Sequence, residues 1–373
     1  MGPKKKMMSI ELKSEIVEKH EQGVRVIDLA RMYGCSTSMI CSELKQELIK
    51  GTTPARGVTI ISKLRTSLHE KMEKLLIVWV TEKQLQGGTL TQSIMWEKAR
   101  AIYVMDLRGK SVFLTGGARG LGRGIVEELL SLGAKVLFCD VNVEQGRVTE
   151  VELQKQYGAD VVFFQEADVS DEEQHKAAFA AAVSKLGVVD ICVNNAGISD
   201  ENSWEKVLEV NTGAYIRGSL LALKHMRRDL GGCGGVIINV ASLLGLMPMA
   251  TSPVYAASKH AVVGFTTSWA MSPDQKEHGV RWCCLCPGIF NSELLQETLN
   301  SNRVYHVQDV QQYLQDHGVM PVSQVAQAVI KLIQDPDNNG AILEVSLAKG
   351  ARYRRRQIVD RDGVSDLVVV DTY

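Results

Sequence analysis

The segment KSVFLTGGARGLG, residues 110–122, decides the fold of the larger part of this 373-residue chain. Its first six residues predict a short buried strand, and a glycine-rich segment follows directly. A helical pattern comes next, and a second apolar run, Lys135–Cys139, ends at Asp140. This order is typical of the first unit of a dinucleotide-binding fold: a strand, a glycine loop, a helix, a second strand and an acidic residue. Glycines let the backbone approach a pyrophosphate, the helix N-terminus offers N–H groups, and the acid accepts hydrogen bonds from ribose hydroxyls.

Apolar and amphipathic segments keep alternating after this unit, which predicts further strands and helices in turn. The expected strands are Val161–Gln165, Val189–Val193, Gly235–Val240, Val280–Cys286 and a last one near Ala341–Val345. Helices are expected from about Asp171 to Leu186, from about Ser203 to Arg228, and around Tyr255. The predicted fold class is therefore α/β, a doubly wound (Rossmann-like) parallel sheet with helices on both faces.

The most informative chemical pattern is Tyr255 and Lys259, with Ser242 thirteen residues upstream. A spacing of four on a helix places the phenol and the ammonium on one face, about one turn apart. The positive charge should then favour the phenolate and lower the pKa of Tyr255 from its usual value of about 10. Such a phenol can take a proton from a substrate alcohol while hydride leaves the same carbon. Taken alone, the same spacing also fits an ordinary amphipathic helix.

Length and charge distribution indicate two parts with different partners. A chain of 373 residues is long for one domain. Residues 1–105 contain 17 Lys and Arg against 11 Asp and Glu, whereas the remainder contains 25 against 32. Residues 1–105, the head, are therefore basic, and residues 106–373, the body, are acidic. This difference suggests that the two parts bind different molecules.

The eight cysteines do not have the spacing of a disulfide framework or a zinc site, so no metal is expected. Cys283, Cys284 and Cys286 lie in an apolar run that predicts a buried strand. A reduced compartment, cytoplasm or nucleus or both, is therefore expected. No apolar run approaches the roughly 20 residues that a membrane-spanning helix needs.

Together, the motifs resemble those of the short-chain dehydrogenase/reductase family, and the resemblance runs from Asp106 to about Gly350. It predicts a dehydrogenase domain at residues 105–350. The matching motifs are TGxxxGxG at 115–122, Asp140, Asp168-Val169, NNAG at 194–197, Asn211, Ser242, YxxxK at 255–259 and Pro287-Gly288.

The resemblance implies a role for each matching residue. Tyr255 would be the general base, Lys259 would lower its pKa and hold the nicotinamide ribose, Ser242 would orient the substrate hydroxyl, and Asn211 would anchor a proton-relaying water. The implied cofactor-binding residues are Gly116, Arg119, Gly120, Leu121, Gly122, Asp140, Asp168, Val169, Asn195, Ala196, Gly197, Tyr255, Lys259, Pro287 and Gly288.

Two residues of the predicted cofactor site favour different cofactors. Arg119 could attract the extra phosphate of NADP, whereas Asp140 would repel that phosphate and bind the ribose diol of NAD. Because Asp140 sits at the ribose itself, NAD is the predicted cofactor.

Within the family, segments such as Asn202–Lys206 and Leu246–Pro248 are most similar to the branch that oxidises hydroxylated fatty acids of the prostaglandin type. The apolar residues 243–250 fit a pocket for a lipid chain, or core packing beneath the site. Ser252 stands where that branch has a glutamine that helps hold the reacting hydroxyl. The implied substrate residues are Ser242, Ser252 and Tyr255. Family members usually pair through the helices containing Asn211 and Tyr255, which implies a homodimer or tetramer.

The head contains three helical patterns: one after Ser9, one at Val26–Tyr33, and one from Thr37 to about Leu48, with Gly34 before the last. This outline fits a helix-turn-helix and equally a plain three-helix bundle. In a helix-turn-helix, base edges would face the early residues of the third helix and phosphate would face a lysine. These candidate DNA contacts are Thr37, Ser38, Met39, Ser42 and Lys45.

Residues 1–103 resemble the N-terminal DNA-binding region of Tigger/pogo-type transposases and centromere protein B. The resemblance implies a small all-α region with a psq-type helix-turn-helix at 1–52 and a truncated second one at 53–104. DNA binding through residues 1–104 would then be weak and salt-dependent. Two origins stay open for the join: a transposon-derived exon, or a gene-model error. Residues 351–373 are expected to form a solvated C-terminal tail.

Two functions are compatible with these observations. The first is an NAD-dependent dehydrogenase that oxidises a secondary lipid alcohol to a ketone. The second is a DNA-bound regulator that senses NAD with little turnover. The first is favoured because a sensor needs only the glycine loop and Asp140, whereas the chain also contains Asn211, Ser242, Tyr255 and Lys259.

Overall fold

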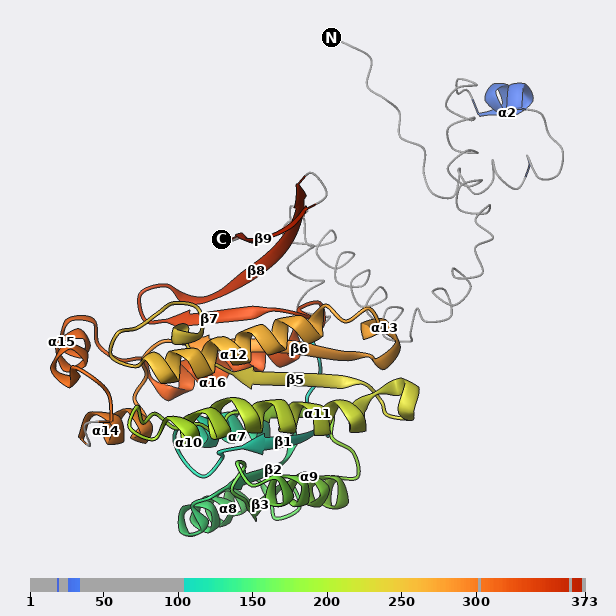
Figure 1. Cartoon of the computed structure of the whole chain (residues 1–373). Coiled ribbons are helices and arrows are strands. Elements are labelled where there is room, and N and C mark those ends of the chain that lie inside the picture. Colours follow the sequence, from blue (N-terminus) through green and yellow to red (C-terminus); the bar gives the residue numbers. More distant parts are fainter. Residues whose placement is uncertain (1–18, 20–25, 34–103, 301–302, 362–363, 371–373) are drawn as a thin grey trace, which may run out of the picture. The chain divides into compact units, whose positions relative to one another are not determined.

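The computed structural model describes residues 19, 26–33, 104–300, 303–361 and 364–370 (Figure 1). The chain divides into two units, Met1–Ile102 and Tyr103–Tyr373, each described by itself. In the first unit, helix α2 spans Val26–Met32, which confirms the helix predicted there. The other helices predicted for the head lie outside the described residues, as do the candidate DNA contacts Thr37, Ser38, Met39, Ser42 and Lys45.

The second unit is built on a twisted sheet that, in the described part of the chain, has nine strands in the order β3-β2-β1-β4-β5-β6-β7-β8-β9. The first seven strands of this order are parallel, so the predicted doubly wound sheet is confirmed. These strands are β1 (Ser111–Thr115), β2 (Lys135–Asp140), β3 (Val162–Glu166), β4 (Ile191–Asn194), β5 (Gly235–Val240), β6 (Val280–Pro287) and β7 (Ile342–Ser346).

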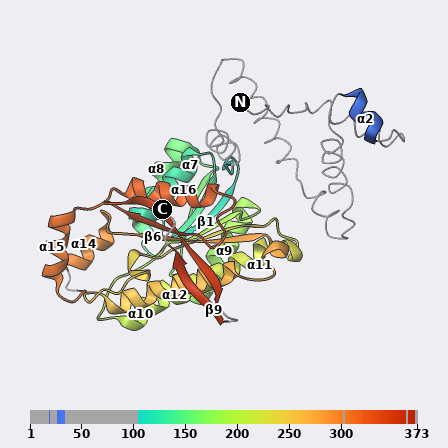
Figure 2. The same cartoon turned by 90° about the horizontal axis from the view of Figure 1, so that it is seen from above.

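Helices cover both faces of this sheet, as the view from above shows (Figure 2). One face carries α7 (Gly120–Ser131), α8 (Val143–Tyr157) and α16 (Val322–Gln334). The opposite face carries α9 (Glu172–Leu186), α11 (Ala214–Met226) and α12 (Pro253–Ala270). Shorter elements connect them: α10 (Trp204–Leu208), η1 (Glu209–Gly213), η2 (Arg228–Leu230), η3 (Leu243–Gly245), α13 (Gln275–His278), α14 (Glu293–Asn300) and α15 (Val307–His317).

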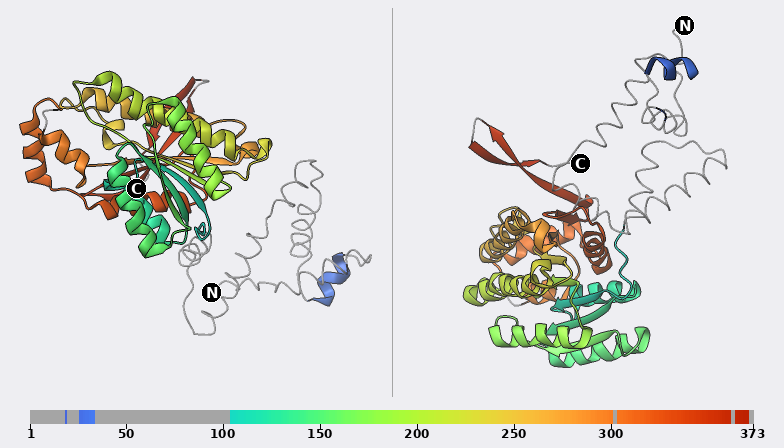
Figure 3. Two further views of the ribbon diagram at one scale, coloured as in Figure 1. Left: turned by 90° about the horizontal axis from the view of Figure 1, so that it is seen from below. Right: turned by 90° about the vertical axis from the view of Figure 1, so that its right-hand side faces the viewer.

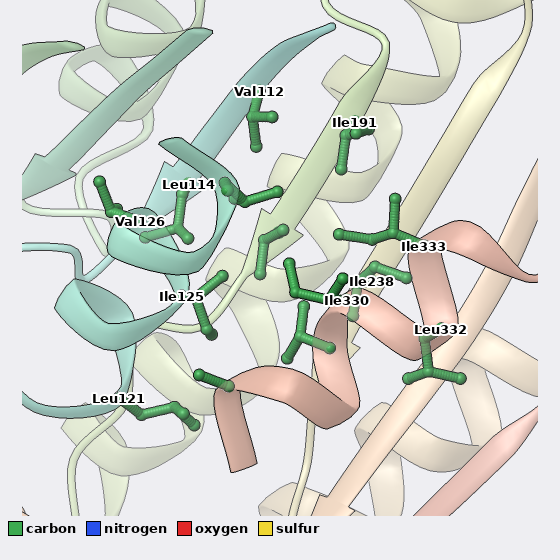
Figure 4. Packing of buried hydrophobic residues seen from close by; sticks show 14 of the residues in the cluster. Val112, Leu114, Leu121, Ile125, Val126, Ile191, Ile238, Ile330, Leu332 and Ile333 are labelled. Carbon is green, nitrogen blue, oxygen red and sulfur yellow. The ribbon is translucent and has the colours of Figure 1, made fainter. Parts of the chain in front are cut away.

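Alternation along each strand sends side chains to the two faces in turn. In β1, Val112 and Leu114 join the cluster beneath α7 and α16, whereas Phe113 joins the cluster beneath α9 and α11. Figure 4 shows Ile125 of α7 and Ile330 of α16 near these strands. All five side chains are buried, and each contributes about 1.5–3 kcal/mol to folding by leaving water. This packing fixes the ends of the strands, where the candidate site lies.

The predicted helix from Ser203 to Arg228 is not continuous. The chain forms α10, then the π-helical turn η1 at Glu209–Gly213, and then α11. A π-turn adds a residue to the helical turn and is often found at functional sites. Here the turn contains Asn211, one of the predicted site residues.

The C-terminal segment differs from the expected solvated tail. Strand β8 (Gly350–Arg361) pairs antiparallel with β7, and β9 (Val364–Val370) pairs antiparallel with β8. Figure 3 shows this red hairpin extending from the edge of the sheet. A physical reason is an ion pair at the start of β8, because Arg354 Nε donates to the buried carboxylate of Glu344 at 2.6 Å. Among the described residues, the structure contains no helix that is both long and apolar enough to cross a membrane.

Candidate active site

The carboxyl ends of β1, β4, β5 and β6 meet at one edge of the sheet. The order of the strands reverses at β1, which has β2 on one side and β4 on the other. Open parallel sheets bind ligands in the crevice outside such a reversal. The glycine loop, the NNAG segment, Ser242 and Pro287-Gly288 all follow these strands, so the predicted motifs come together.

Tyr255 and Lys259 lie on the first two turns of α12, as predicted. Pro253 begins the helix, a position where the missing N–H costs nothing. The Lys259 nitrogen lies 5.6 Å from the centre of the Tyr255 ring. Ser242, which follows β5, forms a side-chain hydrogen bond with Tyr255. The structure therefore places the predicted base, amine and hydroxyl together.

Lys259 is buried, and its amine lies against the last residue of β5. Its Nζ donates to the Val240 carbonyl at 3.0 Å and to the Tyr215 hydroxyl at 3.3 Å, and lies 4.7 Å from the Tyr215 ring centre. Burial lowers the pKa of Lys259 from 10.5 to about 8. The amine is thus held in place by groups from β5 and α11.

The expected fall in the pKa of Tyr255 is not seen in this structure. Burial raises that pKa to about 12, and the hydrogen bond from Ser242 opposes the rise. The reason is that desolvation of the phenolate outweighs the attraction of an amine that directs its hydrogen bonds to Val240 and Tyr215. The sequence reasoning had the right pair of residues but the wrong direction for the pKa in this state.

Asn211 is fully buried within the π-turn and is held on both sides of its amide. Its Oδ1 accepts from Ile198 N and its Nδ2 donates to Ile198 O, both at 2.9 Å. Its Nδ2 also lies 3.2 Å from Ser258 Oγ. A Cβ at Gly197 would meet Asn211 Oδ1 at 3.3 Å and Lys259 Nζ at 3.6 Å. Asn211, Lys259 and the last residue of NNAG are therefore neighbours.

The glycine loop has the backbone conformation of a pyrophosphate-binding turn. Gly116 and Gly120 have φ values of +70° and +55°, in the left-handed region that favours glycine. A Cβ at Gly122 would lie 1.8 Å from Gly116 O, so only glycine allows the helix to approach the loop this closely. The loop leads directly into the N-terminus of α7, whose N–H groups favour an anion. The residues present thus fit a dinucleotide.

Asp140 and Arg119 occupy different positions around this loop. Asp140 ends β2, and its carboxylate accepts hydrogen bonds from Ala118 N and Asn142 N, both at 3.0 Å. Arg119 instead pairs with Glu297 of α14 at 2.7 Å. The carboxylate is therefore fixed at the end of β2, whereas the guanidinium already has an acidic partner.

Most other predicted cofactor residues line or support the same edge. Asn195 Nδ2 donates to the carbonyls of Thr115 and Gly116, at 3.0 and 2.9 Å, and so braces the loop. Ala196 N donates to Thr115 Oγ1 at 3.1 Å. Leu121 and Val169 are buried.

Asp168 accepts hydrogen bonds from Ser170 and Lys206. Partial burial alone would raise the pKa of Asp168, but these hydrogen bonds hold it below its usual range.

Pro287 and Gly288 pass close to the segment after Ser242. Gly288 N donates to Val345 O at 2.7 Å, and a Cβ there would lie 3.1 Å from Leu243. The expected substrate residue Ser252 is buried at the N-cap of α12, where its side chain makes no capping hydrogen bond.

A hollow of about 610 Å³ lies beside α12 and the segment 248–250, and its lining includes Met249, Ala250 and Ala257. Three residues of the predicted lipid-facing segment, Pro248, Met249 and Ala250, therefore line a hollow. Neither Ser242 nor Tyr255 is among its lining residues, but Ala256, the neighbour of Tyr255 in the chain, is. A second hollow, of about 440 Å³, lies between Arg119 and α14, at the glycine loop.

Comparisons with known proteins agree with this geometry. The family described as short chain dehydrogenase matches residues 110–303. Human 15-hydroxyprostaglandin dehydrogenase [NAD(+)] is 39% identical over 257 residues, 67% of this chain and 96% of the human enzyme. This chain belongs to the short-chain dehydrogenase family. Membership confirms that the body of the chain is an enzyme, a dehydrogenase.

Two further proteins are similar to this chain over less of its length and at lower identity. The 3beta-hydroxysteroid dehydrogenase 2 of Eggerthella lenta is 37% identical over 193 residues, 49% of this chain and 71% of that enzyme. The crystal structure of levodione reductase matches with a TM-score of 0.58 and 26% identity, and covers 64% of this chain and 96% of that one.

Several residues that support the site of this short-chain dehydrogenase were missed by sequence reasoning. Thr115 accepts hydrogen bonds from Asn195 and Ala196, Tyr215 accepts one from Lys259, and Ser258 bonds to both Asn211 and Tyr255. Glu201, which is buried, accepts two hydrogen bonds from the first turn of α12. Thr115 and Ser258 belong to the quoted motifs and could have been singled out, but no sequence pattern connects Tyr215 with Lys259 or Glu201 with α12.

Proposed function

We propose that this dehydrogenase oxidises a secondary alcohol to a ketone with NAD, and that its substrate is a hydroxylated fatty acid of the prostaglandin type. The observation that carries the proposal is the convergence of Ser242, Tyr255, Lys259 and Asn211 beside the glycine loop. NAD, when bound, supplies the acceptor for the hydride that leaves the alcohol carbon.

The residues of the chain act on the proton of the substrate hydroxyl. Ser242 orients this hydroxyl by hydrogen bonding, and Tyr255 Oη takes its proton as the carbon gives up hydride. A positioned base of this kind accelerates a reaction by about 10²- to 10⁴-fold. Asn211 anchors a water that carries the proton onward, and Lys259 holds the nicotinamide ribose.

The choice of NAD follows from the position of Asp140. Its carboxylate is fixed by two backbone N–H groups at the end of β2, where it would accept the ribose hydroxyls and repel a 2′-phosphate. Arg119, the residue that could attract the phosphate, is paired with Glu297.

Similarity to 15-hydroxyprostaglandin dehydrogenases supports the proposed substrate class. The human and bovine enzymes of that name are 39% and 38% identical to this chain over 257 and 254 residues. This chain has Ser252 where a glutamine is expected in that branch of the family. The substrate hydroxyl would therefore be held chiefly by Ser242 and Tyr255.

The test is steady-state turnover. Formation of NADH is followed at neutral and alkaline pH with hydroxylated fatty acids, prostaglandin-type lipids and short secondary alcohols. Turnover of the long-chain lipids, and a higher kcat/KM for them than for short alcohols, is the expected result. NAD binding without turnover of any alcohol would instead favour the NAD-sensing alternative.

Three further proposals concern the whole chain. The dehydrogenase unit forms a homodimer or tetramer through the helical segments that contain Asn211 and Tyr255, residues 1–104 bind DNA weakly, and the protein resides in the cytoplasm or nucleus or both. Sedimentation of the full-length protein tests the first proposal, and imaging of a tagged chain tests the third.

A further inference from the structure

The N-terminus of α12 is capped by a carboxylate from a distant part of the chain. Glu201 Oε2 accepts from Val254 N at 2.8 Å, and Glu201 Oε1 accepts from Tyr255 N at 2.9 Å. Only 5% of Glu201 is exposed to solvent. One buried carboxylate thus binds the main chain of the proposed general base itself.

This cap replaces one that the helix does not provide locally. The first N–H groups of a helix have no partner within it, and a Ser at the N-cap usually binds one of them. Ser252 is the N-cap of α12, yet its side chain makes no such bond. The amides of the second and third helical residues, Val254 and Tyr255, are bound by Glu201 instead.

Glu201 is itself held by the segment that follows α14. Its N–H donates to the Arg303 carbonyl at 2.8 Å, and Tyr305 N donates to the Thr251 carbonyl at 2.9 Å. The segment at 303–305 therefore binds both Glu201 and the residue just before the α12 N-cap. These bonds restrict where the carboxylate and the first turn of α12 can move.

On this basis, and resting on the proposed function, we propose that Glu201 is a positioning residue for Tyr255. Its two hydrogen bonds hold the first turn of α12 in place, and its negative charge, which lies against the main chain of Tyr255, opposes ionisation of the phenol. Glu201 does not contact the phenol and is not itself a catalytic residue.

The electrostatic part of the proposal has a definite sign. The positive end of α12 and the amine of Lys259 both favour the phenolate, whereas the carboxylate of Glu201 disfavours it. The hydroxyls of Ser242 and Tyr215 also interact with Tyr255. Asp200, which precedes Glu201 in the chain, lies 4.0 Å from Arg303, and Arg303 also lies 3.6 Å from Glu297. Removing the charge of Glu201 should therefore lower the pKa of the phenol.

The deciding variant is Glu201→Gln, compared with wild type and with Glu205→Gln, an exposed acid four residues further on. The oxidation rate rises with pH as the base loses its proton. In Glu201→Gln this rise should move by about half a pH unit to lower pH, as expected for loss of one charge at a helix end. In Glu205→Gln the oxidation rate should rise at the same pH as in wild type.

A second variant separates charge from geometry. Glu201→Asp keeps the charge but shortens the side chain by one methylene, so kcat should fall about tenfold or more while the pH of the rise stays as in wild type. A readout independent of activity is amide hydrogen exchange of the full-length protein. In Glu201→Gln, exchange should quicken about tenfold in residues 254–256, and stay unchanged in α7.

The outcomes distinguish the inference from the function on which it rests. If wild type turns over alcohols but Glu201→Gln changes neither the pH of the rise nor the exchange at 254–256, the positioning role is wrong and the dehydrogenase proposal stands. If wild type oxidises no alcohol, the proposed function fails. Exchange at 254–256 then still decides whether Glu201 holds α12.

Discussion

The side-chain nitrogen of Lys259 lies closer to the ring centre of Tyr215, at 4.7 Å, than to that of Tyr255, at 5.6 Å. Lys259 therefore does not act on Tyr255 alone. It binds the Val240 carbonyl and the Tyr215 hydroxyl, so that β5, α11 and α12 share one buried amine. The geometry of the site depends on this shared contact.

Replacing Tyr255 by Phe should abolish turnover. The substitution removes the hydroxyl that takes the substrate proton, and loss of a positioned base costs about 10²- to 10⁴-fold in rate. Binding of NAD, measured by titration calorimetry, should change little because the glycine loop and Asp140 are untouched. The matched control is Tyr157→Phe on α8, which should keep wild-type turnover. Retained turnover in Tyr255→Phe would refute the catalytic assignment.

Lys259 should make the protein more stable as the pH rises. Burial lowers its pKa from 10.5 to about 8, so between these values the unfolded chain binds more protons than the folded chain. The free energy of unfolding should therefore increase across this interval, by about 3 kcal/mol at most.

The measurement is urea unfolding of the cofactor-free protein at several pH values from 7.5 to 10, compared with Lys259→Met. The buried thiols of Cys139, Cys192 and Cys283 have raised pKa values and act in the opposite direction above pH 9. They are present in both proteins and cancel in the difference. Parallel pH profiles of the two proteins would contradict the buried-amine account.

Replacing Asp140 by Ala should weaken the preference for NAD over NADP. The variant loses the acceptor for the ribose hydroxyls and the charge that repels a 2′-phosphate. Since a hydrogen bond to a charged group contributes about 1.5–3 kcal/mol, the ratio of kcat/KM values should fall about ten- to a hundredfold. Glu144→Gln, an exposed acid in the first turn of α8, is the control. An unchanged ratio would mean that Asp140 does not select the cofactor.

A methyl group at Gly122 should disrupt the nucleotide loop. The added Cβ would lie 1.8 Å from Gly116 O and 2.7 Å from Asn195 Nδ2, so the backbone must shift. Gly122→Ala should lower the free energy of unfolding by more than about 2 kcal/mol and weaken NAD binding. Gly264→Ala on α12 is the matched control, because a Cβ there meets nothing within 4 Å. That control should be neutral or stabilising by up to about 1 kcal/mol.

DNA binding by the head should be weak and should depend steeply on salt. The basic excess of residues 1–105 would be attracted to phosphate, and counterion release makes such affinity fall as salt is added. A gel-shift assay of the full-length protein on random duplex DNA between 50 and 200 mM salt is the measurement. Charge reversal at Lys45 should weaken the shift, and a salt-independent shift would contradict an electrostatic origin.

The local parts of the site were predictable because each depends on a short stretch of sequence. The glycine loop needs its glycines for contacts within one turn, and Tyr255 and Lys259 share a face because they lie four residues apart on one helix. The strand at Val280–Cys286 was likewise evident from its run of mostly apolar residues. The break in the predicted helix at Asn211 could not be seen, since a π-turn has no distinct apolar period.

From sequence alone came the α/β class, the seven parallel strands, the dinucleotide loop and the residues of the dehydrogenase motif, since these depend on local spacing and composition. Only the tertiary structure decided that Lys259 binds Tyr215 and Val240, that burial raises the pKa of Tyr255, that Glu201 caps α12, and that β8 extends the sheet. Each of these joins segments far apart in the chain. Burial and hydrogen bonding between such segments are set by packing, which no local pattern encodes.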